Sequence, residues 1–471
     1  MKVQLFWLLL LVAFNSYAQK QASVWYFGNN AGLDFRNGDP VPLTDGALST
    51  FEGSASICDE AGNLLFYTDG VTVYNRMHIP MPNGKNLWGS FTTTQTLIVP
   101  QPESQTIFYI FTASFFVGDD SVGFHYSTID ISLNNWLGDV VEKNVLLFKN
   151  TTEKMSAVYH ADGINIWVVA HEWGNNTFRS YLVTKNGISN KPVISSIGSV
   201  HKGGGFQDQS NAAGQMKLSP DGGKLAVVIP FREIEFFNFD VSIGKVLNRT
   251  GNIIRTNDSV LNFYGIEFSS DNNFLYYATT VGACGFNDPD NASELWQYSF
   301  VNKSPIKVGE FVGTLSSLQL AINGKIYISR CNDIIGESDY MAEITYPNRV
   351  GEACGFVSKG VSLNGRNNQI GLPNFIQSYF QFSDAVFDLP NFFSPNGDEF
   401  NSFFKPTNTE NLIAADLRII NRWGQEVFHT TDVALGWDGG DAASGVYYWF
   451  LFYEGKNGKT GTRKGWVQLA R

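Results

Sequence analysis

The chain has 471 residues, about three times the length of a typical single domain, so several domains or a repeat architecture are expected. Aromatic residues make up 14% of it and charged residues 16%, against a usual charged share of about 25%, which excludes a disordered chain or a coiled coil. So many aromatic residues with 46 glycines predict an all-β protein of short strands and tight turns. The net charge of −11 argues against nucleic acid or an anionic membrane as a partner.

The N-terminus has the pattern of a secretory signal peptide. Lys2 precedes an apolar run from Leu5 to Phe14, and small residues around Ser16 and Ala18 suit a cleavage site. We expect residues 1–18 to be removed by cleavage between Ala18 and Gln19. The run has about half the length of a membrane span and no later stretch is longer, so no transmembrane helix is predicted.

Four cysteines enter an oxidising compartment, at positions 58, 284, 331 and 354. No CxxC pair is present, so a zinc site is not favoured. Cys58 fits a small buried residue. Spacing does not fix the pairing; Cys331 with Cys354 is the candidate disulfide.

A short strand, a turn rich in Asp, Asn and Gly, and a second strand recur six times along the chain. The average spacing is about 52 residues, close to that of kelch-like propeller units, and each copy precedes further strand-like sequence. Four strands per unit are therefore expected. The six copies span 55–68, 97–112, 157–170, 216–229, 266–279 and 318–329.

The two ends of this region complement one another. Residues 24–35 supply two strands without a partner, and residues 375–382 read as an inner strand without successors. A shared seventh unit would close the ring, because a closed ring leaves no sheet edge unpaired. The sequence thus predicts a seven-bladed β-propeller over residues 19–382.

After Phe382 the repeat stops. Residues 383–471 contain alternating strands separated by turns every 8 to 12 residues, which predicts a small immunoglobulin-like β-sandwich.

This last segment carries an ordered set of motifs that resembles the gliding motility-associated C-terminal domain. That domain is the type B sorting domain of the type IX secretion system in Bacteroidetes. The resemblance implies a partner, the type IX secretion machinery, and export across the outer membrane to the cell surface or the exterior. The matching residues are Phe393, Ser394, Pro395, Asn396, Gly397, Asp398, Asn401, Asn421, Arg422, Trp423, Gly424, Trp437, Asp438, Gly439, Gly445 and Tyr447.

The preceding region also resembles the N-terminal parts of such Bacteroidetes surface proteins. The resemblance rests on the sequence at 52–75, on MPNG at 81–84 and on GLPNFIQSYF at 371–380. It implies an architecture and a destination, and no activity.

Catalytic motifs are not found in the sequence. There is no GxSxG elbow, the HExxH pattern that His171 begins lacks its second histidine at Asn175, and GGG at 203–205 lacks the rest of a phosphate-binding loop. No cofactor is expected. Calcium is a candidate at Asp288, Asp290 and Glu294, or at Asp398 with Asn401, although a solvated loop is a sufficient explanation of these residues and the favoured one.

One local cluster of polar and aromatic residues is a candidate ligand face: His171, Glu172, Trp173 and Arg179. We therefore expect a non-catalytic binding or adhesion module that contacts an extracellular glycan or a surface protein. The alternative is a propeller glycoside hydrolase or polysaccharide lyase, because such enzymes gather carboxylates from different blades. Carboxylates converging in a central funnel would favour the enzyme, and an aromatic patch would favour the binding module.

Overall fold

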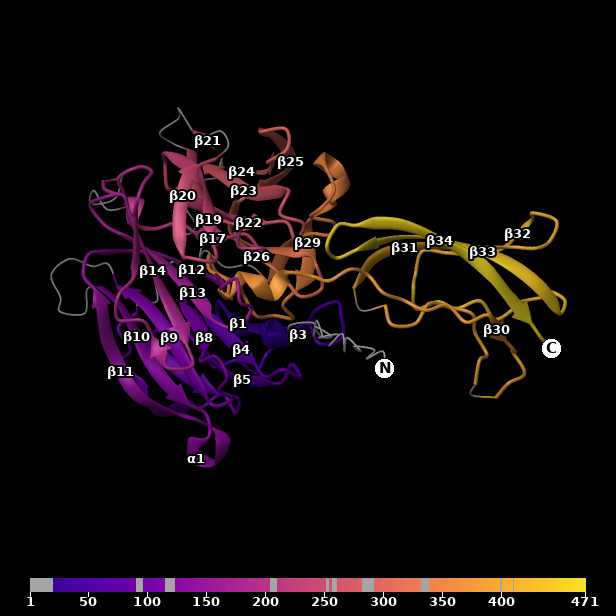
Figure 1. The fold of residues 1–471 in the computed structure, drawn as a ribbon, viewed down its shortest axis with the longest axis horizontal. Helices are drawn as coiled ribbons and strands as arrows, with labels where there is room; N and C mark the ends of the chain where they lie inside the picture. The colour runs from indigo at the N-terminus through magenta and orange to yellow at the C-terminus, as the bar shows by residue number, and fades with distance from the viewer. Residues whose placement is uncertain are drawn as a thin grey trace, which may run out of the picture.

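The computed structural model describes residues 20–89, 96–114, 123–203, 210–250, 254–255, 261–281, 292–331, 339–398, 400–409 and 411–471. It confirms the all-β prediction. A large body of small antiparallel sheets leads to a C-terminal sheet that projects to one side (Figure 1). The predicted signal peptide and its cleavage site at Ala18 and Gln19 lie outside the described residues.

The first half of the body holds four sheets in chain order. Sheet 1 contains β1 (Val24–Phe27), β2 (Ala31–Asp34) and β3 (Val41–Leu43). Sheet 2 contains β4 (Ala55–Cys58), β5 (Leu64–Thr68), β6 (Thr72–Asn75) and β7 (Pro80–Lys85). Sheet 3 contains β8 (Leu97–Pro100), β9 (Ile107–Ser114), β10 (Gly123–Asp130) and β11 (Asp139–Phe148). Sheet 4 contains β12 (Thr151–Tyr159), β13 (Ile166–Glu172), β14 (Thr177–Thr184), β15 (Gly187–Ile188) and β16 (Val193–Ser196).

Three further sheets complete the body. Sheet 5 contains β17 (Met216–Leu218), β18 (Lys224–Ile229), β19 (Glu233–Asp240), β20 (Lys245–Arg249) and β21 (Ile254–Arg255). Sheet 6 contains β22 (Leu261–Phe268), β23 (Phe274–Val281), β24 (Ala292–Ser299) and β25 (Ser304–Val312). Sheet 7 contains β26 (Thr314–Leu320), β27 (Ile326–Cys331), β28 (Tyr340–Ile344) and β29 (Phe356–Ser362). The helical segments are α1 (Leu133–Trp136), η1 (Lys20–Ala22), η2 (Ser210–Ala212), η3 (Gly351–Cys354) and η4 (Gln377–Phe380).

Each of the six predicted repeats forms the hairpin of the first two strands of one sheet, from sheet 2 to sheet 7. Neighbouring sheets pack through their first strands in chain order, except that β12 of sheet 4 packs against β9, the second strand of sheet 3. Sheet 7 meets sheet 1 through ring contacts of Tyr327 with Trp25, at 6.0 Å, and with Phe35, at 5.3 Å. These contacts close a propeller-like ring of sheets around a shared core.

The predicted inner strand at 375–382 is wrong. Sheet 1 has only three strands in the described part of the chain, and residues 377–380 form the 3-10 helix η4, with all four side chains buried. Parallel bridges join Pro373 to Ser54 and Ile376 to Ala157. The segment therefore crosses from the first strand of sheet 2 to that of sheet 4, and its apolar residues reflect burial on every side.

Polar side chains meet where the first strands of sheets 5, 6 and 7 face one another. The Lys217 ammonium lies 3.2 Å from a Glu267 carboxylate oxygen and donates to Gln319 Oε1 at 2.5 Å, and all three residues are fully buried. Glu267 also accepts hydrogen bonds from the backbone N–H groups of Phe268 and Leu320. The buried charges of Lys217 and Glu267 are thus satisfied by each other and by neighbouring hydrogen bonds.

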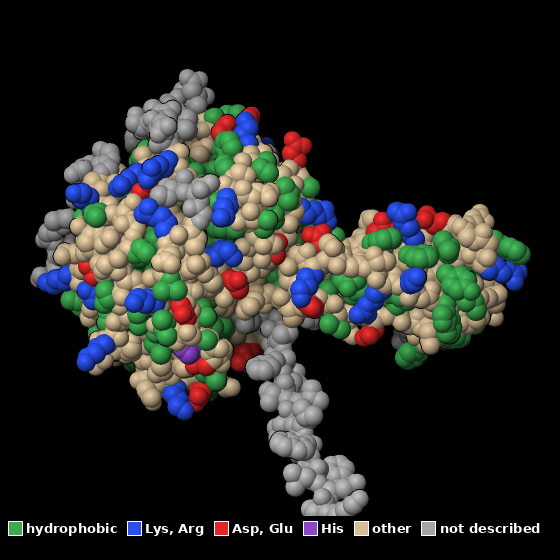
Figure 2. Space-filling model, turned by 45° about the horizontal axis from the view of Figure 1, so that its top comes forward, with side chains coloured by type: hydrophobic (Ala, Val, Ile, Leu, Met, Phe, Trp, Pro, Cys, Tyr) green, Lys and Arg blue, Asp and Glu red, His purple; other side chains and the backbone are tan. Residues whose placement is uncertain are grey.

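The C-terminal sheet has the order β30-β34-β33-β31-β32. Its strands are β30 (Phe392–Phe393), β31 (Leu412–Ile420), β32 (Glu426–Thr430), β33 (Gly445–Gly455) and β34 (Thr460–Leu469). One face is covered by segments that pair through bridges, Asp388 with Thr407 and Phe404 with Trp437. The other carries exposed aromatic side chains, including Tyr448 and Trp466, and Figure 2 shows hydrophobic side chains gathered on this unit.

The hairpin between β33 and β34 holds this sheet against the body. The Arg349 guanidinium donates two hydrogen bonds to Glu454 Oε2, at 2.8 and 2.6 Å, and stacks 3.8 Å from the ring of Tyr346. Lys456 donates to the carbonyl of Ile322 at 3.0 Å. Polar side chains of both parts thus join the C-terminal sheet to the body.

Candidate functional site

Two of the four residues of the predicted ligand face, Glu172 and Arg179, form an ion pair. Arg179 Nε lies 2.5 Å from Glu172 Oε1, and Asn175 donates to Glu172 Oε2 at 2.6 Å. His171 is fully buried, and the backbone N–H of Trp173 donates to the carbonyl of Asn150. The structure thus brings Glu172 and Arg179 together and turns His171 inward, away from any ligand.

His171 belongs to a buried group that sequence reasoning missed. Its ring stacks on that of His201 at 3.7 Å, and neither His201 nitrogen nor His171 Nε2 has a hydrogen-bond partner among the described residues. Burial, with the nearby Lys154 charge, lowers the pKa of His171 to about 3 and that of His201 well below its ordinary value. Lys154 donates to the carbonyls of Asn211, Ala212 and Ala213, and burial lowers its pKa to about 7.

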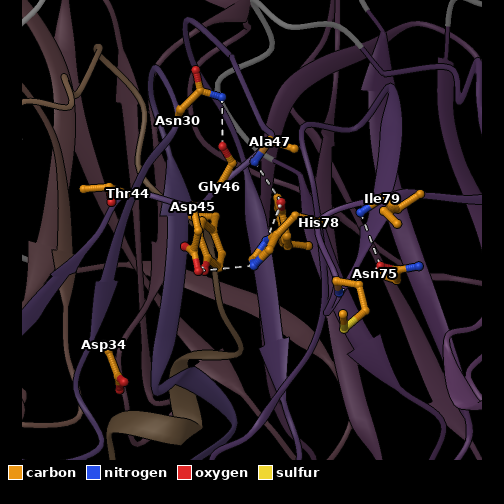
Figure 3. Close-up of polar contacts among 12 residues, drawn as sticks. Asn30, Asp34, Thr44, Asp45, Gly46, Ala47, Asn75, His78 and Ile79 are labelled. Atoms are coloured by element: carbon orange, nitrogen blue, oxygen red, sulfur yellow. Dashed lines mark hydrogen bonds and ion pairs between the residues drawn. The ribbon is translucent and has the colours of Figure 1, made fainter.

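A second polar group lies where sheets 1 and 2 meet (Figure 3). Tyr26 donates to Asp45 Oδ1 at 2.8 Å, and His78 Nε2 lies 3.4 Å from Asp45 Oδ2. On the other side of the ring, His78 Nδ1 lies 3.0 Å from the Tyr67 hydroxyl, which accepts a hydrogen bond from Ala47 N–H. The rings of Tyr26 and Tyr67 stack at 4.4 Å.

These contacts join the loop that holds Asp45 and Ala47 to the turn that holds His78. Burial raises the pKa of Tyr67 to about 12, and burial together with the Asp45 carboxylate raises that of Tyr26 further, so both phenols stay protonated. Tyr67 is fully buried, and only Asp45 is mostly exposed. The group resembles a catalytic triad in composition, but both of its tyrosines are buried and out of reach of a substrate, so its geometry suits positioning of the loops.

A pocket of about 680 Å³ lies on the side of the body where the first hairpins of sheets 2, 3 and 4 turn. Its volume falls within the range of roughly 300–1,000 Å³ that is usual for small-ligand sites. Each of the three turns belongs to one of the six predicted repeats. Its lining comprises Gln21, Ile57, Cys58, Asp59, Glu60, Ala61, Leu65, Pro100, Gln101, Pro102, Glu103, Ser104, Gln105, Phe108, Ile131, Trp136, Tyr159, Gly163, Ile164 and Ile166.

Trp136 reaches this pocket from the tip of α1. Asn134, Asn135 and Trp136 have φ values of 51°, 55° and 63°, in the left-handed region that asparagine tolerates better than most residues. Arg76 donates to the Trp136 carbonyl and holds the tip. The indole is left 58% exposed, as expected of a ring that a ligand could cover.

The carboxylates that line the pocket differ in what they already bind. Asp59 accepts from the N–H groups of Ala61 and Asn63, which fixes the turn, and Glu103 lies 3.2 Å from the Lys185 ammonium. Glu60 has no ion-pair partner among the described residues. Of the three carboxylates in the lining, Glu60 is the exposed one without a fixed polar contact among the described residues.

The other predicted sites have mixed outcomes. Asp288 and Asp290 lie outside the described residues, and Glu294 pairs with Lys307 at 3.2 Å. Asp398 accepts from Phe400 N–H and from the Asn396 amide within its own loop. No group of three or more side chains that could ligate a metal ion occurs among the described residues.

The candidate disulfide is not formed in the structure. Cys354 has a free thiol that is buried beside Tyr276, and burial raises its pKa to about 11. The side chain of Cys331 lies outside the described residues. Cys58 is buried and free, as its apolar surroundings predicted.

The motif residues of the C-terminal segment serve as core and turn residues. Trp437 is buried, contacts the rings of Phe393 at 5.2 Å and Tyr447 at 4.9 Å, and pairs by two backbone hydrogen bonds with Phe404. Other motif residues shape three turns. Asn421 accepts from the N–H groups of residues 423 and 425, and Gly424, Gly397 and Gly439 have positive φ.

Residues 387–469 match a known family, the CHU_C Type IX secretion signal domain. This part of the chain is a type IX secretion signal. It marks the protein for export across the outer membrane to the cell surface or the exterior, and implies handling by the type IX secretion machinery. In the described part of the chain, no helix has the length and apolar character that crossing a membrane would require.

Comparisons over the whole chain add little. No curated protein matches it. A periplasmic gluconolactonase from Pseudomonas aeruginosa has 11% identity and a TM-score of 0.38, over 95% of this chain and 97% of that one. The extracellular domain of a protein named as a hybrid two-component system from B. thetaiotaomicron has 9% identity and a TM-score of 0.39, over 94% of this chain and 55% of that one. Similarities at this level carry no information on activity.

Proposed function

We propose that the exported protein is a non-catalytic binding module that holds an extracellular glycan in the pocket of sheets 2–4. The observation that carries this proposal is the exposed indole of Trp136 above a pocket with apolar walls and polar edges. Flat aromatic side chains with a few polar groups suit a sugar ring, which has apolar faces and a hydroxyl-bearing rim.

The state of the described carboxylates supports binding over hydrolysis. Glu267 is buried against Lys217, and Glu233 and Glu235 on β19 are engaged by Arg255 and Arg249. A glycoside hydrolase would need two carboxylates free to act on one bond, about 5 to 9 Å apart.

The test is binding of mature protein to a panel of bacterial and algal oligosaccharides by calorimetry, with reducing-end release measured in parallel. Trp136→Ala should weaken binding at least tenfold without changing the melting temperature, since the side chain is exposed. Trp423→Ala, which removes a tryptophan that is 79% exposed on the C-terminal unit, is the matched control. Release of reducing ends would favour the hydrolase or lyase alternative.

A further inference from the structure

The charged side chains that line the pocket of sheets 2–4 are all acidic. Its lining contains three carboxylates, Asp59, Glu60 and Glu103, and no lysine, arginine or histidine. A cavity lined by one sign of charge concentrates ligands of the other sign. The charges of the lining itself therefore disfavour an acidic polysaccharide.

Glu60 is the carboxylate available to a ligand. Asp59 accepts hydrogen bonds from the backbone of its own turn, and Glu103 forms an ion pair with Lys185. Glu60 is exposed at the pocket edge. Glu60 also lies near enough to Tyr159 to contribute to the raised pKa of that phenol, so the carboxylate and the aromatic wall face the same space. Gln21 adds a buried side-chain oxygen with no hydrogen-bond partner among the described residues.

Unpaired acceptors beside aromatic rings favour a ligand that donates hydrogen bonds and carries positive charge. An ammonium group satisfies a carboxylate and an amide oxygen, and it is also attracted to the faces of Trp136 and Tyr159. The pocket is large enough for a few sugar rings but not for a folded partner.

We propose that this pocket selects oligosaccharides with free amino groups, such as glucosamine oligomers, with Glu60 binding the ammonium and Trp136 covering the sugar ring. This inference rests on the proposed glycan-binding function and names the ligand class of the same site. A lysine-rich peptide offers the same ammonium without the flat ring, and is therefore the less favoured occupant.

The experiment compares glucosamine oligomers with their N-acetylated counterparts of equal length, in weakly acidic buffer in which the sugar amine is protonated. Acetylation removes the charge and leaves the ring, so the glucosamine form should bind mature protein about threefold to tenfold more tightly. Glu60→Gln should abolish this difference, and added salt should reduce it. Glu352→Gln, an exposed glutamate outside the pocket, is the matched control, and circular dichroism checks the fold of each variant.

The outcomes separate this inference from the proposed function. Equal binding of both oligomers, lost in Trp136→Ala but unchanged in Glu60→Gln, would overturn the amine selectivity and leave a neutral-glycan site. Binding of a lysine-rich peptide without binding of any sugar would overturn both. Tighter binding of acidic oligosaccharides would contradict the charge argument directly.

Discussion

His171 and His201 bury three imidazole nitrogens without partners, and this should make the protein sensitive to acid. Their folded-state pKa values lie below the ordinary value of about 6.5, so below that pH the unfolded chain binds protons that the folded chain does not. The stability that depends on keeping these two histidines neutral is therefore fully present above about pH 6.5. It should fall by up to about 1.4 kcal/mol per pH unit per histidine as the pH drops toward 3.

Urea denaturation between pH 7.5 and about 4.5 measures this slope. His201→Phe should flatten it, because phenylalanine fills the stacked position without unsatisfied nitrogens. His429→Phe changes an exposed histidine and should leave the slope as it is. A wild-type slope that persisted in His201→Phe would assign the acid sensitivity to other groups.

The buried pair of Lys217 and Glu267 predicts a strong coupling. Lys217→Met should cost about 3–5 kcal/mol, because it leaves the Glu267 carboxylate buried without its counter-charge. The double variant Lys217→Met with Glu267→Gln should lose less than the sum of the two single variants. A double-mutant cycle by chemical denaturation measures the coupling, and strictly additive losses would show that the pair does not interact.

At the scale of single elements, the hairpin turn of sheet 5 gives a matched pair of glycines. Gly222 has φ +74°, and a Cβ there would lie 2.5 Å from Val241 Cγ1 and 2.9 Å from Val158 Cγ2. Gly223 has ordinary backbone geometry, with its nearest neighbour at 3.5 Å. Gly222→Val should therefore cost about 1–3 kcal/mol, whereas Gly223→Ala should cost little, with glycan binding intact in both. Thermal denaturation of the pair checks this, and equal losses would contradict the strained turn.

These hairpins were predictable because a turn and its two strands are local in sequence. The pocket was not, because it forms only where turns from three sheets meet Trp136 at the tip of α1, and each turn alone looks like architecture. The strand predicted at 375–382 was wrong for a related reason. Their aromatic content matches a strand, but Phe375 and Tyr379 are buried by contacts with Trp25 and Tyr159 rather than by a sheet.

At the scale of the whole molecule, the body and the C-terminal sheet have separate hydrophobic cores. The C-terminal core is built around Trp437 and Leu451 and does not include residues of the body. The two parts meet through polar contacts such as Arg349 with Glu454. This arrangement allows the secretion signal to be altered while the body stays folded.

The separate cores of the body and the C-terminal sheet lead to a prediction about export. Deleting residues 383–471 should leave a folded body in the periplasm, because the match to the type IX secretion signal lies wholly within them. Trp437→Ala should have the same effect, since a buried tryptophan cut to alanine costs about 3–5 kcal/mol and the motif residues form one core rather than a linear tag. Trp423→Ala changes an exposed motif residue in a turn, and should leave the fold of the signal intact.

Cell fractionation in a strain with an intact type IX route measures each outcome, with protease resistance of the body as the folding control. Surface display of the truncated protein would refute the assignment of sorting to the C-terminal sheet, and normal export of a destabilised Trp437→Ala variant would show that a short segment, rather than the folded sheet, is what the machinery recognises.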